Sequence, residues 1–283
     1  MAQYAHPETL VETDWVARHL GDPKIKLLEI DVDTQAYDAG HIPGAVGFNW
    51  QTQLQDQVRR DIPSKEQFAR LVGAAGVSPD DVVILYGDNH NWFAAYGFWL
   101  FKMYGHKEVR LMNGGRVKWL NEDNRPMTNE KPRVKPVTYT VKEVRTAEYR
   151  ALLLEVMEAS KTRNRNLVDV RSPDEFTGKI IAPPNLPETA QRGGHIPGAK
   201  NIPWSTAVNT QNGTFKSPDD LRTIYQTNAG VDFSKDTIAY CRIGERSSHT
   251  WFVLKYLLGI DNVKNYDGSW TEYGNLVGAP IEK

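Results

Sequence analysis

The stretch His41-Ile-Pro-Gly-Ala45 occurs a second time as His195-Ile-Pro-Gly-Ala199, an offset of 154 residues (195 − 41). Within each half, a short apolar run, Asp81–Tyr86 or Asp236–Tyr240, leads through a turn into a helix-like stretch. Strands that alternate with helices are typical of βα units with parallel strands. The sequence therefore predicts an α/β protein with two tandem domains, each a mainly parallel sheet flanked by helices. Three further pairs keep the same offset: Tyr86 with Tyr240, Gly114 with Gly268, and Pro126 with Pro280.

A length of 283 residues fits two domains of ordinary size. From Arg125 to about Ala147 the chain holds three prolines and many charges, and helical periodicity resumes only at Glu148. We therefore expect a first domain at residues 1–128, a linker at 129–144 and a second domain at 145–283.

The composition excludes several classes of protein. The net charge is −1 and 24% of residues are charged, so neither a nucleic-acid partner nor a membrane partner is indicated. The first twenty residues carry charges throughout and do not resemble a signal peptide. The most apolar run, Trp92–Phe101, is shorter than the ~20 residues of a membrane span and predicts a buried helix. A single cysteine favours a reducing, cytoplasmic location.

The only cysteine, Cys241, lies in the segment Tyr240-Cys-Arg-Ile-Gly-Glu-Arg-Ser-Ser248. A sole thiol cannot form an internal disulfide or a CxxC pair, which leaves a nucleophile or a carrier of one atom. An apolar strand precedes it, and His249–Leu258 predicts a helix that ends at Gly259. A thiol on such a turn, beside Arg242 and Arg246, is expected to have its pKa lowered from about 8.5 to roughly 3.5–7.5.

The repeat serves as an internal control for function. At the offset of 154, Cys241 faces Gly87, Arg242 faces Asp88 and Arg246 faces Trp92. The first domain therefore keeps the frame without the reactive groups, and we expect it to support a catalytic second domain. A histidine occupies the same position of both halves, His41 in the first and His195 in the second. This repetition favours a structural role, in which the imidazole forms a hydrogen bond within its turn. His249 lies about two helical turns beyond Cys241, which is too far for the imidazole to act as the base that deprotonates the thiol.

The cysteine turn predicts a ring of backbone N–H donors around the sulfur, supplied by Ile243, Gly244, Glu245 and Ser247. Only four residues separate Cys241 from Arg246, whereas a phosphatase of this design has five. The shorter turn fits a terminal sulfur on cysteine, a persulfide, better than a phosphate. Arg242 and Arg246, which we interpret as unpaired, can then bind the oxyanion end of a sulfur donor.

Together, these segments resemble a tandem rhodanese, and within that family the bacterial thiosulfate sulfurtransferases, over essentially the whole chain. The motifs are the paired His-Ile-Pro-Gly-Ala stretches, DVRSPDEF at 169–176, CRIGERS at 241–247 and YDGSW at 266–270. The resemblance implies that only the second domain is catalytic. Cys241 would attack the outer sulfur of thiosulfate, release sulfite and pass its persulfide sulfur to cyanide or a thiol in a ping-pong reaction. Arg246 matches the substrate-binding position of the bacterial enzymes, and Arg242 follows the cysteine as in members that use thiosulfate.

Two positions depart from the family pattern. The vertebrate enzyme has an arginine where this chain has Glu175, and a lysine where it has Ile243. We expect Arg246 to replace this charge, helped by Lys179 or Arg192 from a longer loop, residues 177–194, that only the second half contains. Trp270 is either core or a wall of the substrate site.

Four other functions remain open. A 3-mercaptopyruvate sulfurtransferase uses the same cysteine, although the family's loop for that donor is Cys-Gly-(Ser/Ala)-Gly-Val-Thr. A persulfide relay would pass sulfur to a partner protein. A phosphatase or arsenate reductase is disfavoured by loop length, and a purely structural protein leaves the charged cysteine turn without a purpose. No metal or organic cofactor is expected, because the sequence has no CxxC, HExxH, P-loop or dinucleotide fingerprint.

Overall fold

Parallel pairing of short apolar strands builds a sheet in each half of the computed structural model, which describes residues 3–184 and 189–283. The chain divides into two compact units. The N-terminal unit comprises Glu8–Arg145 and Thr210–Phe215, and the C-terminal unit comprises Met1–Pro7, Thr146–Asn209 and Lys216–Lys283. The domain bounds that we predicted from the sequence, 1–128 and 145–283, remain a prediction.

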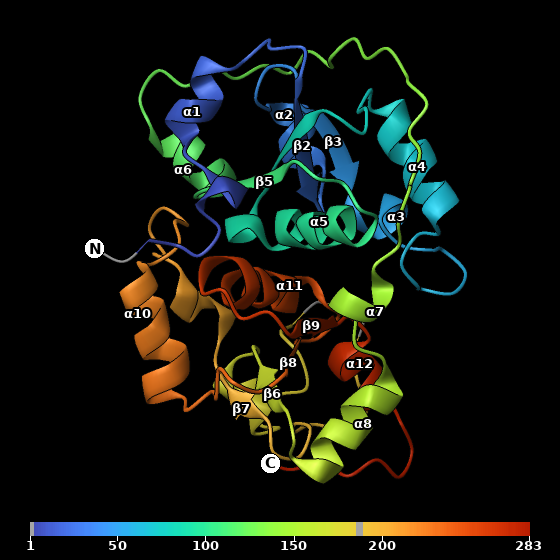
Figure 1. The fold of residues 1–283 in the computed structure, drawn as a ribbon, viewed down its shortest axis with the longest axis vertical. Coiled ribbons are helices and arrows are strands. Elements are labelled where there is room, and N and C mark those ends of the chain that lie inside the picture. The colour runs from blue at the N-terminus through green and yellow to red at the C-terminus, as the bar shows by residue number, and fades with distance from the viewer. Residues whose placement is uncertain (1–2, 185–188) are drawn as a thin grey trace. The chain divides into compact units, whose positions relative to one another are not determined.

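In the N-terminal unit, the strands run in the order β1-β5-β4-β2-β3 and pair in parallel (Figure 1). The helix α5, Trp92–Met103, packs on β2, β4 and β5, which confirms the buried helix predicted for this apolar run. The elements are β1 Leu10–Val11, α1 Thr13–Arg18, β2 Ile25–Asp31, α2 Gln35–Ala39, β3 Val46–Asn49, α3 Trp50–Gln53, α4 Lys65–Ala74, β4 Val82–Tyr86, α5, β5 Val109–Met112 and α6 Gly115–Asn121.

In the C-terminal unit, the order is β7-β6-β8-β9, again in parallel (Figure 1). Taken from the other edge, β9-β8-β6-β7 repeats the order β5-β4-β2-β3, so the sequence repeat is also a repeat of topology. The predicted α/β class with two parallel sheets is confirmed. The elements are α7 Thr146–Tyr149, α8 Leu153–Thr162, β6 Asn166–Asp169, α9 Pro173–Phe176, β7 Lys200–Asn201, α10 Pro218–Arg222, β8 Thr237–Tyr240, α11 Glu245–Phe252, β9 Val263–Tyr266 and α12 Ser269–Tyr273.

The repeated His-Ile-Pro-Gly-Ala stretch makes the same hydrogen bond to the sheet in both units. The Ile42 N–H donates to the hydroxyl of Tyr86 at 3.2 Å. At the offset of 154, the Ile196 N–H donates to the hydroxyl of Tyr240 at 3.1 Å. Both tyrosines end a central strand and are fully buried. A buried N–H needs such a partner, which explains why the tyrosine and the turn recur together.

The two repeated histidines are structural, as predicted. The Nδ1 atom of His41 lies 2.8 Å from the carbonyl oxygen of Tyr37, and that of His195 lies 2.8 Å from the carbonyl oxygen of Phe176. Each imidazole stacks on the ring of that same residue, with interplanar angles of 10°. The histidines therefore tie each turn to the preceding helix, α2 or α9.

Two helices differ from the sequence-based prediction. The helix after the cysteine begins at Glu245 rather than His249, and a π-helical turn, Val253–Leu257, replaces its expected last part. The helical periodicity that resumes at Glu148 does not give one continuous helix, because the Ala151 N–H donates to the carbonyl of Asn265 in β9 at 3.0 Å. Helix α8 therefore begins only at Leu153.

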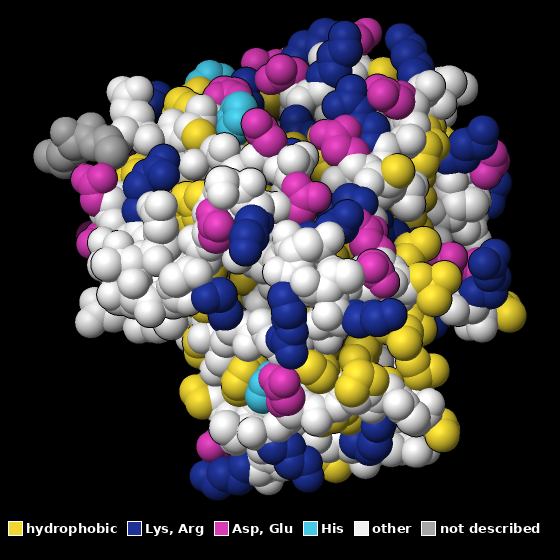
Figure 2. All heavy atoms as spheres, turned by 60° about the horizontal axis from the view of Figure 1, so that its bottom comes forward, with side chains coloured by type: hydrophobic (Ala, Val, Ile, Leu, Met, Phe, Trp, Pro, Cys, Tyr) yellow, Lys and Arg dark blue, Asp and Glu magenta, His cyan; other side chains and the backbone are white. Residues whose placement is uncertain are grey.

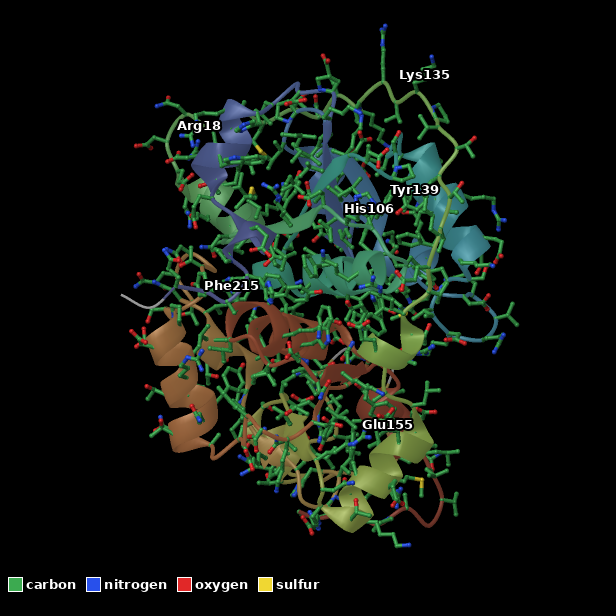
Figure 3. The ribbon with its side chains drawn as sticks, viewed as in Figure 1. Arg18, His106, Lys135, Tyr139, Glu155 and Phe215 are labelled. Carbon is green, nitrogen blue, oxygen red and sulfur yellow. The ribbon has the colours of Figure 1, made fainter. Side chains whose placement is uncertain are left out.

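The segment predicted as a linker, residues 129–144, has no regular helix or strand but is anchored on the N-terminal unit. The Val137 N–H donates to the carbonyl of Gly73 at 2.9 Å. The hydroxyl of Tyr139 lies 3.0 Å from Nδ1 of His106, and Figure 3 shows the two labelled side chains near each other. Tyr139 is buried. This segment is thus held by specific contacts along its length.

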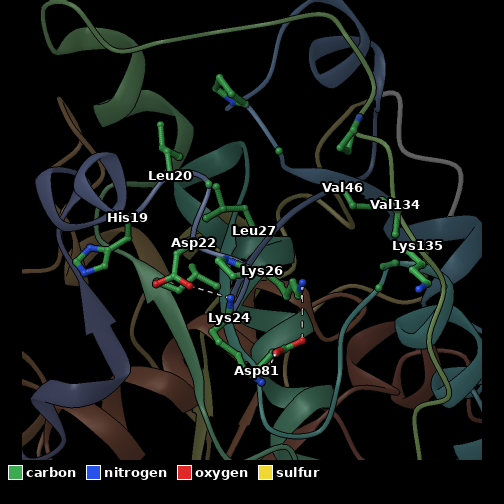
Figure 4. Close-up of a pocket in the computed structure, with 18 of the residues that line it drawn as sticks. His19, Leu20, Asp22, Lys24, Lys26, Leu27, Val46, Asp81, Val134 and Lys135 are labelled. Atoms are coloured by element: carbon green, nitrogen blue, oxygen red, sulfur yellow. Dashed lines mark hydrogen bonds and ion pairs between the residues drawn. The ribbon is translucent and has the colours of Figure 1, made fainter.

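A cavity of about 660 Å³ opens at the amino ends of strands in the N-terminal unit (Figure 4). The carboxylate of Asp81 lies 3.9 Å from Nζ of Lys24 and 4.0 Å from Nζ of Lys26. Val134 and Lys135 of the segment described above complete one side. None of the predicted site residues lines this cavity.

The surface carries both signs of charge. On the face shown in Figure 2, acidic side chains lie among basic ones, as the net charge of −1 suggests. Within the described residues, no helix is long and apolar enough to span a membrane.

The tyrosine contact to the repeated turn can be tested by Tyr86→Phe. This change leaves the buried Ile42 N–H without an acceptor and removes a hydrogen bond to the Glu29 side chain. We expect the free energy of unfolding to fall by about 1–3 kcal/mol, measured by urea unfolding of the full chain. An unchanged unfolding midpoint would contradict this account of the turn.

Candidate functional site

Strand β8 delivers Cys241 to the carboxyl end of the C-terminal sheet, where the chain turns into α11. Gly244 begins the helix with a φ of 102°, a left-handed conformation that favours glycine. A Cβ at this position would lie 2.8 Å from Cα and Cβ of Asp267. Both constraints require glycine, and the resulting tight turn places the amino end of α11 at the sulfur.

The Cys241 sulfur is fully buried and surrounded by polar groups. The Gly244 N–H donates to Sγ at 3.1 Å, and the thiol donates to Oε2 of Glu245 at 3.3 Å. Two hydroxyls complete the surroundings, with Oγ of Ser247 at 3.6 Å and Oγ of Ser269 at 4.0 Å. Of the predicted ring of amides, Gly244 is the clearest donor and Ser247 contributes a second N–H. Glu245 reaches the sulfur through its side chain instead.

The pKa of the thiol departs from the sequence-based prediction. Burial raises the pKa of Cys241 above its ordinary value, and the negative charge of Glu245 raises it further. Arg246 and the Ser247 hydrogen bonds act in the opposite direction without reversing the shift. The expected lowering was wrong because the sequence does not show that the turn is buried, nor that a carboxylate lies against the sulfur.

Arg246 is paired, which corrects its interpretation as an unpaired cation. Its Nη1 and Nη2 donate to the two carboxylate oxygens of Glu175 at 3.0 and 3.1 Å, and its Nε lies 3.7 Å from Oε1 of Glu245. Burial opposes ionisation of Glu175, yet the hydrogen bonds and charge of Arg246 hold the pKa of that carboxyl below its ordinary value. Glu175 therefore takes two of the five N–H donors of Arg246.

Glu175 is itself fixed by the start of α9. Its carboxylate accepts from the N–H of Ser172 at 3.1 Å, while the Ser172 hydroxyl accepts from the Glu175 N–H at 3.3 Å. This reciprocal capping box holds the acid rigidly at the first turn of the helix. The residue that occupies the family's arginine position therefore serves as the partner of Arg246.

The remaining predicted contacts fall into two groups. Arg242 and Ile243 follow the cysteine and are buried in its turn. Lys179, by contrast, is 72% exposed and pairs with Asp174 on α9. Residues 185–188 of the predicted loop lie outside the described residues.

Arg192 holds the end of the chain. Its guanidinium donates to four backbone carbonyls, those of Tyr273, Gly274, Leu276 and Ala279. Trp270 is core: it is buried, its indole N–H donates to the Arg192 carbonyl at 2.9 Å, and the Arg171 guanidinium lies 4.6 Å from its ring centroid. These contacts give both residues structural roles.

Asn265 and Ser269 also belong to the site, although the sequence did not single them out. The Ser247 hydroxyl donates to Oδ1 of Asn265 at 2.6 Å, and the Asn265 amide donates to the Gly244 carbonyl at 3.2 Å. The Ser269 hydroxyl accepts from the Cys241 N–H at 3.1 Å. Asn265 lies in β9, which pairs with β8, and Ser269 begins α12 shortly after that strand. Polar residues at the end of a neighbouring parallel strand were the available signal.

The corresponding turn of the N-terminal unit cannot hold a thiol. A Cβ on Gly87 would lie 2.3 Å from the Ile30 carbonyl oxygen and 2.8 Å from Oδ1 of Asp31. The backbone there packs directly on β2, so any side chain at this position would displace it. Within the described residues, no group of three or more His, Cys, Asp or Glu side chains could hold a metal ion.

Comparisons with known proteins agree with this geometry. A family model described as Rhodanese-like domain matches residues 12–122 and 151–276. A Saccharopolyspora erythraea protein provisionally named thiosulfate sulfurtransferase is 57% identical, covering 97% of this chain and 96% of its own. The sulfur carrier protein TtuD of Thermus thermophilus is 56% identical, covering 99% and 98%.

Solved structures share the fold. SseA of Escherichia coli, described among the 3-mercaptopyruvate sulfotransferases, superposes with a TM-score of 0.79 at 28% identity, covering 93% of this chain and 98% of its own. EanB bound to ergothioneine has a TM-score of 0.88 at 22% identity, covering all of this chain and 72% of its own, which shows the fold alone. The chain is a sulfurtransferase and belongs to the rhodanese family, with two rhodanese-like domains in tandem.

Proposed function

We propose that this protein transfers the outer sulfur of thiosulfate through a persulfide on Cys241. The observation that carries the proposal is the contact between the Gly244 N–H and the only thiol, 3.1 Å, at the amino end of α11. Such a donor stabilises negative charge on the attacking sulfur and on a persulfide. Relatives provisionally named thiosulfate sulfurtransferase, at 57% and 58% identity over nearly the full chain, support this donor.

The reaction proceeds in two displacements. The Cys241 sulfur forms a bond to the outer sulfur of thiosulfate, the S–S bond of thiosulfate breaks, and its electron pair leaves with sulfite. An acceptor such as cyanide or a thiolate then attacks the outer sulfur of the persulfide and restores Cys241. A covalent intermediate of this kind gives ping-pong kinetics. The remaining N–H donors of Arg246 bind the sulfonate end of the donor, with Arg242 adding positive charge.

A relay to a protein thiol is the second candidate. The observation in its favour is the 56% identical relative named as a sulfur carrier protein. The two candidates share the Cys241 persulfide and differ only in the acceptor. Fast transfer to a protein thiol with slow thiocyanate formation would favour the relay.

The central prediction concerns Cys241→Ser. We expect thiocyanate formation from thiosulfate and cyanide to fall by several orders of magnitude, because the hydroxyl is a far weaker nucleophile at neutral pH. Wild-type protein treated with thiosulfate should gain the mass of one sulfur atom, and the variant should not. Since Cys241 is the only cysteine, any gain maps to that residue. A sulfur adduct on the variant would contradict the proposal.

The donor can be assigned by comparing thiosulfate with 3-mercaptopyruvate in the same thiocyanate assay. We expect kcat/KM to be higher for thiosulfate, because the turn is Cys-Arg-Ile-Gly-Glu-Arg rather than the Cys-Gly-(Ser/Ala)-Gly-Val-Thr of the family members that use 3-mercaptopyruvate. A preference for 3-mercaptopyruvate would retain the Cys241 mechanism and overturn the donor.

Arg246→Ala tests the binding of the donor. We expect the KM for thiosulfate to rise about ten- to hundredfold, since a charge-assisted hydrogen bond contributes about 1.5–3 kcal/mol. The matched control is Glu175→Gln, which keeps Arg246 but removes the carboxylate that it pairs with. That control should lower the KM for thiosulfate, because the dianion then meets a guanidinium that faces one carboxylate, Glu245, instead of two. An unchanged KM in Arg246→Ala would show that this residue does not bind the donor.

A further inference from the structure

Glu245 occupies a position that the proposed function leaves unexplained. Its carboxylate is buried, with Oε2 accepting from the Cys241 thiol at 3.3 Å and Oε1 lying 3.7 Å from Nε of Arg246. An acid in the first turn stabilises a helix, and this alone could account for a glutamate here. It does not account for a side chain that turns back from the helix onto the nucleophile.

The charges around the sulfur favour a protonated thiol at rest. Glu245, Arg246 and Glu175 form a row in which the single guanidinium of Arg246 pairs with both carboxylates. Ionising Cys241 would add a third negative charge to this row in a buried site. Three other charged groups surround this row: Arg242, which follows Cys241 in the chain, Arg171, which is paired with Asp169 on β6 and acts on Glu175, and Asp267, which is paired with Arg150 and contacts Gly244.

We infer that Glu245 is the proton acceptor of Cys241, a role that rests on the proposed persulfide mechanism. In the first displacement the S–H bond breaks, the proton moves to Oε2, and the sulfur electron pair forms the bond to the outer sulfur of the donor. Sulfite leaves with the electron pair of the broken S–S bond. When the acceptor removes the outer sulfur, the pair returns to the Cys241 sulfur and Glu245 returns the proton. No net proton is consumed at the cysteine.

Geometry singles out Glu245 for this role among the described residues near the thiol. Glu175 is held on the far side of Arg246 by its two hydrogen bonds to that guanidinium. The His249 ring lies against Trp204, with ring centroids 5.6 Å apart, two helical turns beyond the cysteine. The serines of the site carry hydroxyls, which are weak proton acceptors at neutral pH.

The first test measures where the thiol ionises, without any turnover. The ultraviolet absorbance of the thiolate is followed against pH for the wild-type full chain, with Cys241→Ser subtracted. We expect a midpoint above that of a free cysteine, about 8.5, and a shift to lower pH in Glu245→Gln, which removes a negative charge at constant size. Asp174→Asn, which changes an exposed carboxylate on α9, is the matched control and should leave the midpoint unchanged.

The second test measures formation of the persulfide in a single turnover with thiosulfate. For the wild type the rate constant should be independent of pH between about 6 and the thiol midpoint, since the ionised acceptor of the proton is already in place. In Glu245→Gln it should fall at least about tenfold near pH 6 and then rise with the thiolate fraction. Glu245→Asp, which keeps the acid on a shorter side chain, should restore part of the loss.

The outcomes are distinct. Identical midpoints and identical pH profiles in the wild type and Glu245→Gln would overturn the role of Glu245, while the persulfide itself would still support the proposed function. A wild-type protein that forms no persulfide would overturn the proposed function and this role with it, even if the thiol midpoint still shifts. If Glu245→Gln does not fold, a wild-type midpoint at or below that of free cysteine overturns the role by itself, and Glu245→Asp takes the place of the variant.

Discussion

The tight turn between Cys241 and Gly244 is the constraint on which the site depends. Its left-handed glycine packs against Asp267 without room for a Cβ, and only that conformation brings the Gly244 N–H to 3.1 Å from the sulfur. The parallel sheet supplies the rest, because β8 ends at the cysteine and β9 ends beside it. Asn265 of β9 and the Ser269 hydroxyl at the start of α12 then bind the turn, so that the nucleophile is held by backbone geometry rather than by its own side-chain packing.

Comparison of the two repeated units separates the residues that maintain the fold from those that carry the reactive groups. Both units keep the strand order, the buried tyrosine and the histidine turn, and these contacts recur at the same offset to within 0.1 Å for the Ile42 and Ile196 hydrogen bonds, 3.2 and 3.1 Å. What differs is the residue after the central strand. Gly87 lies so close to the Ile30 carbonyl that its turn is closed to any nucleophile. Loss of the thiol in the N-terminal unit is therefore built into the packing of its sheet and would not be reversed by a single substitution.

The sequence allowed the frame and the nucleophile to be predicted, because periodicity, turn residues and internal repetition are local signals. The strands, the buried α5 and the cysteine turn followed from them. Side-chain pairing did not, since Glu175 lies 71 positions before Arg246 and no spacing rule joins the two. The same lack of long-range information explains why the thiol pKa was predicted in the wrong direction. The prediction rested on two nearby arginines and did not include the carboxylates that pair with Arg246 or the burial that desolvates the sulfur.

A buried thiol with a raised pKa is at first sight a poor nucleophile, yet the arrangement suits a carrier of sulfur. A thiol that ionises freely is open to oxidation in the resting protein, whereas a protonated and buried thiol is protected. Arg246 lies between two carboxylates, so a donor anion that binds to it competes directly with their charge. Binding of the anion thereby changes the balance that holds the proton on the sulfur. This competition weakens the pairing of Arg246 with Glu245, so that the carboxylate becomes a better acceptor for the thiol proton when the donor is bound.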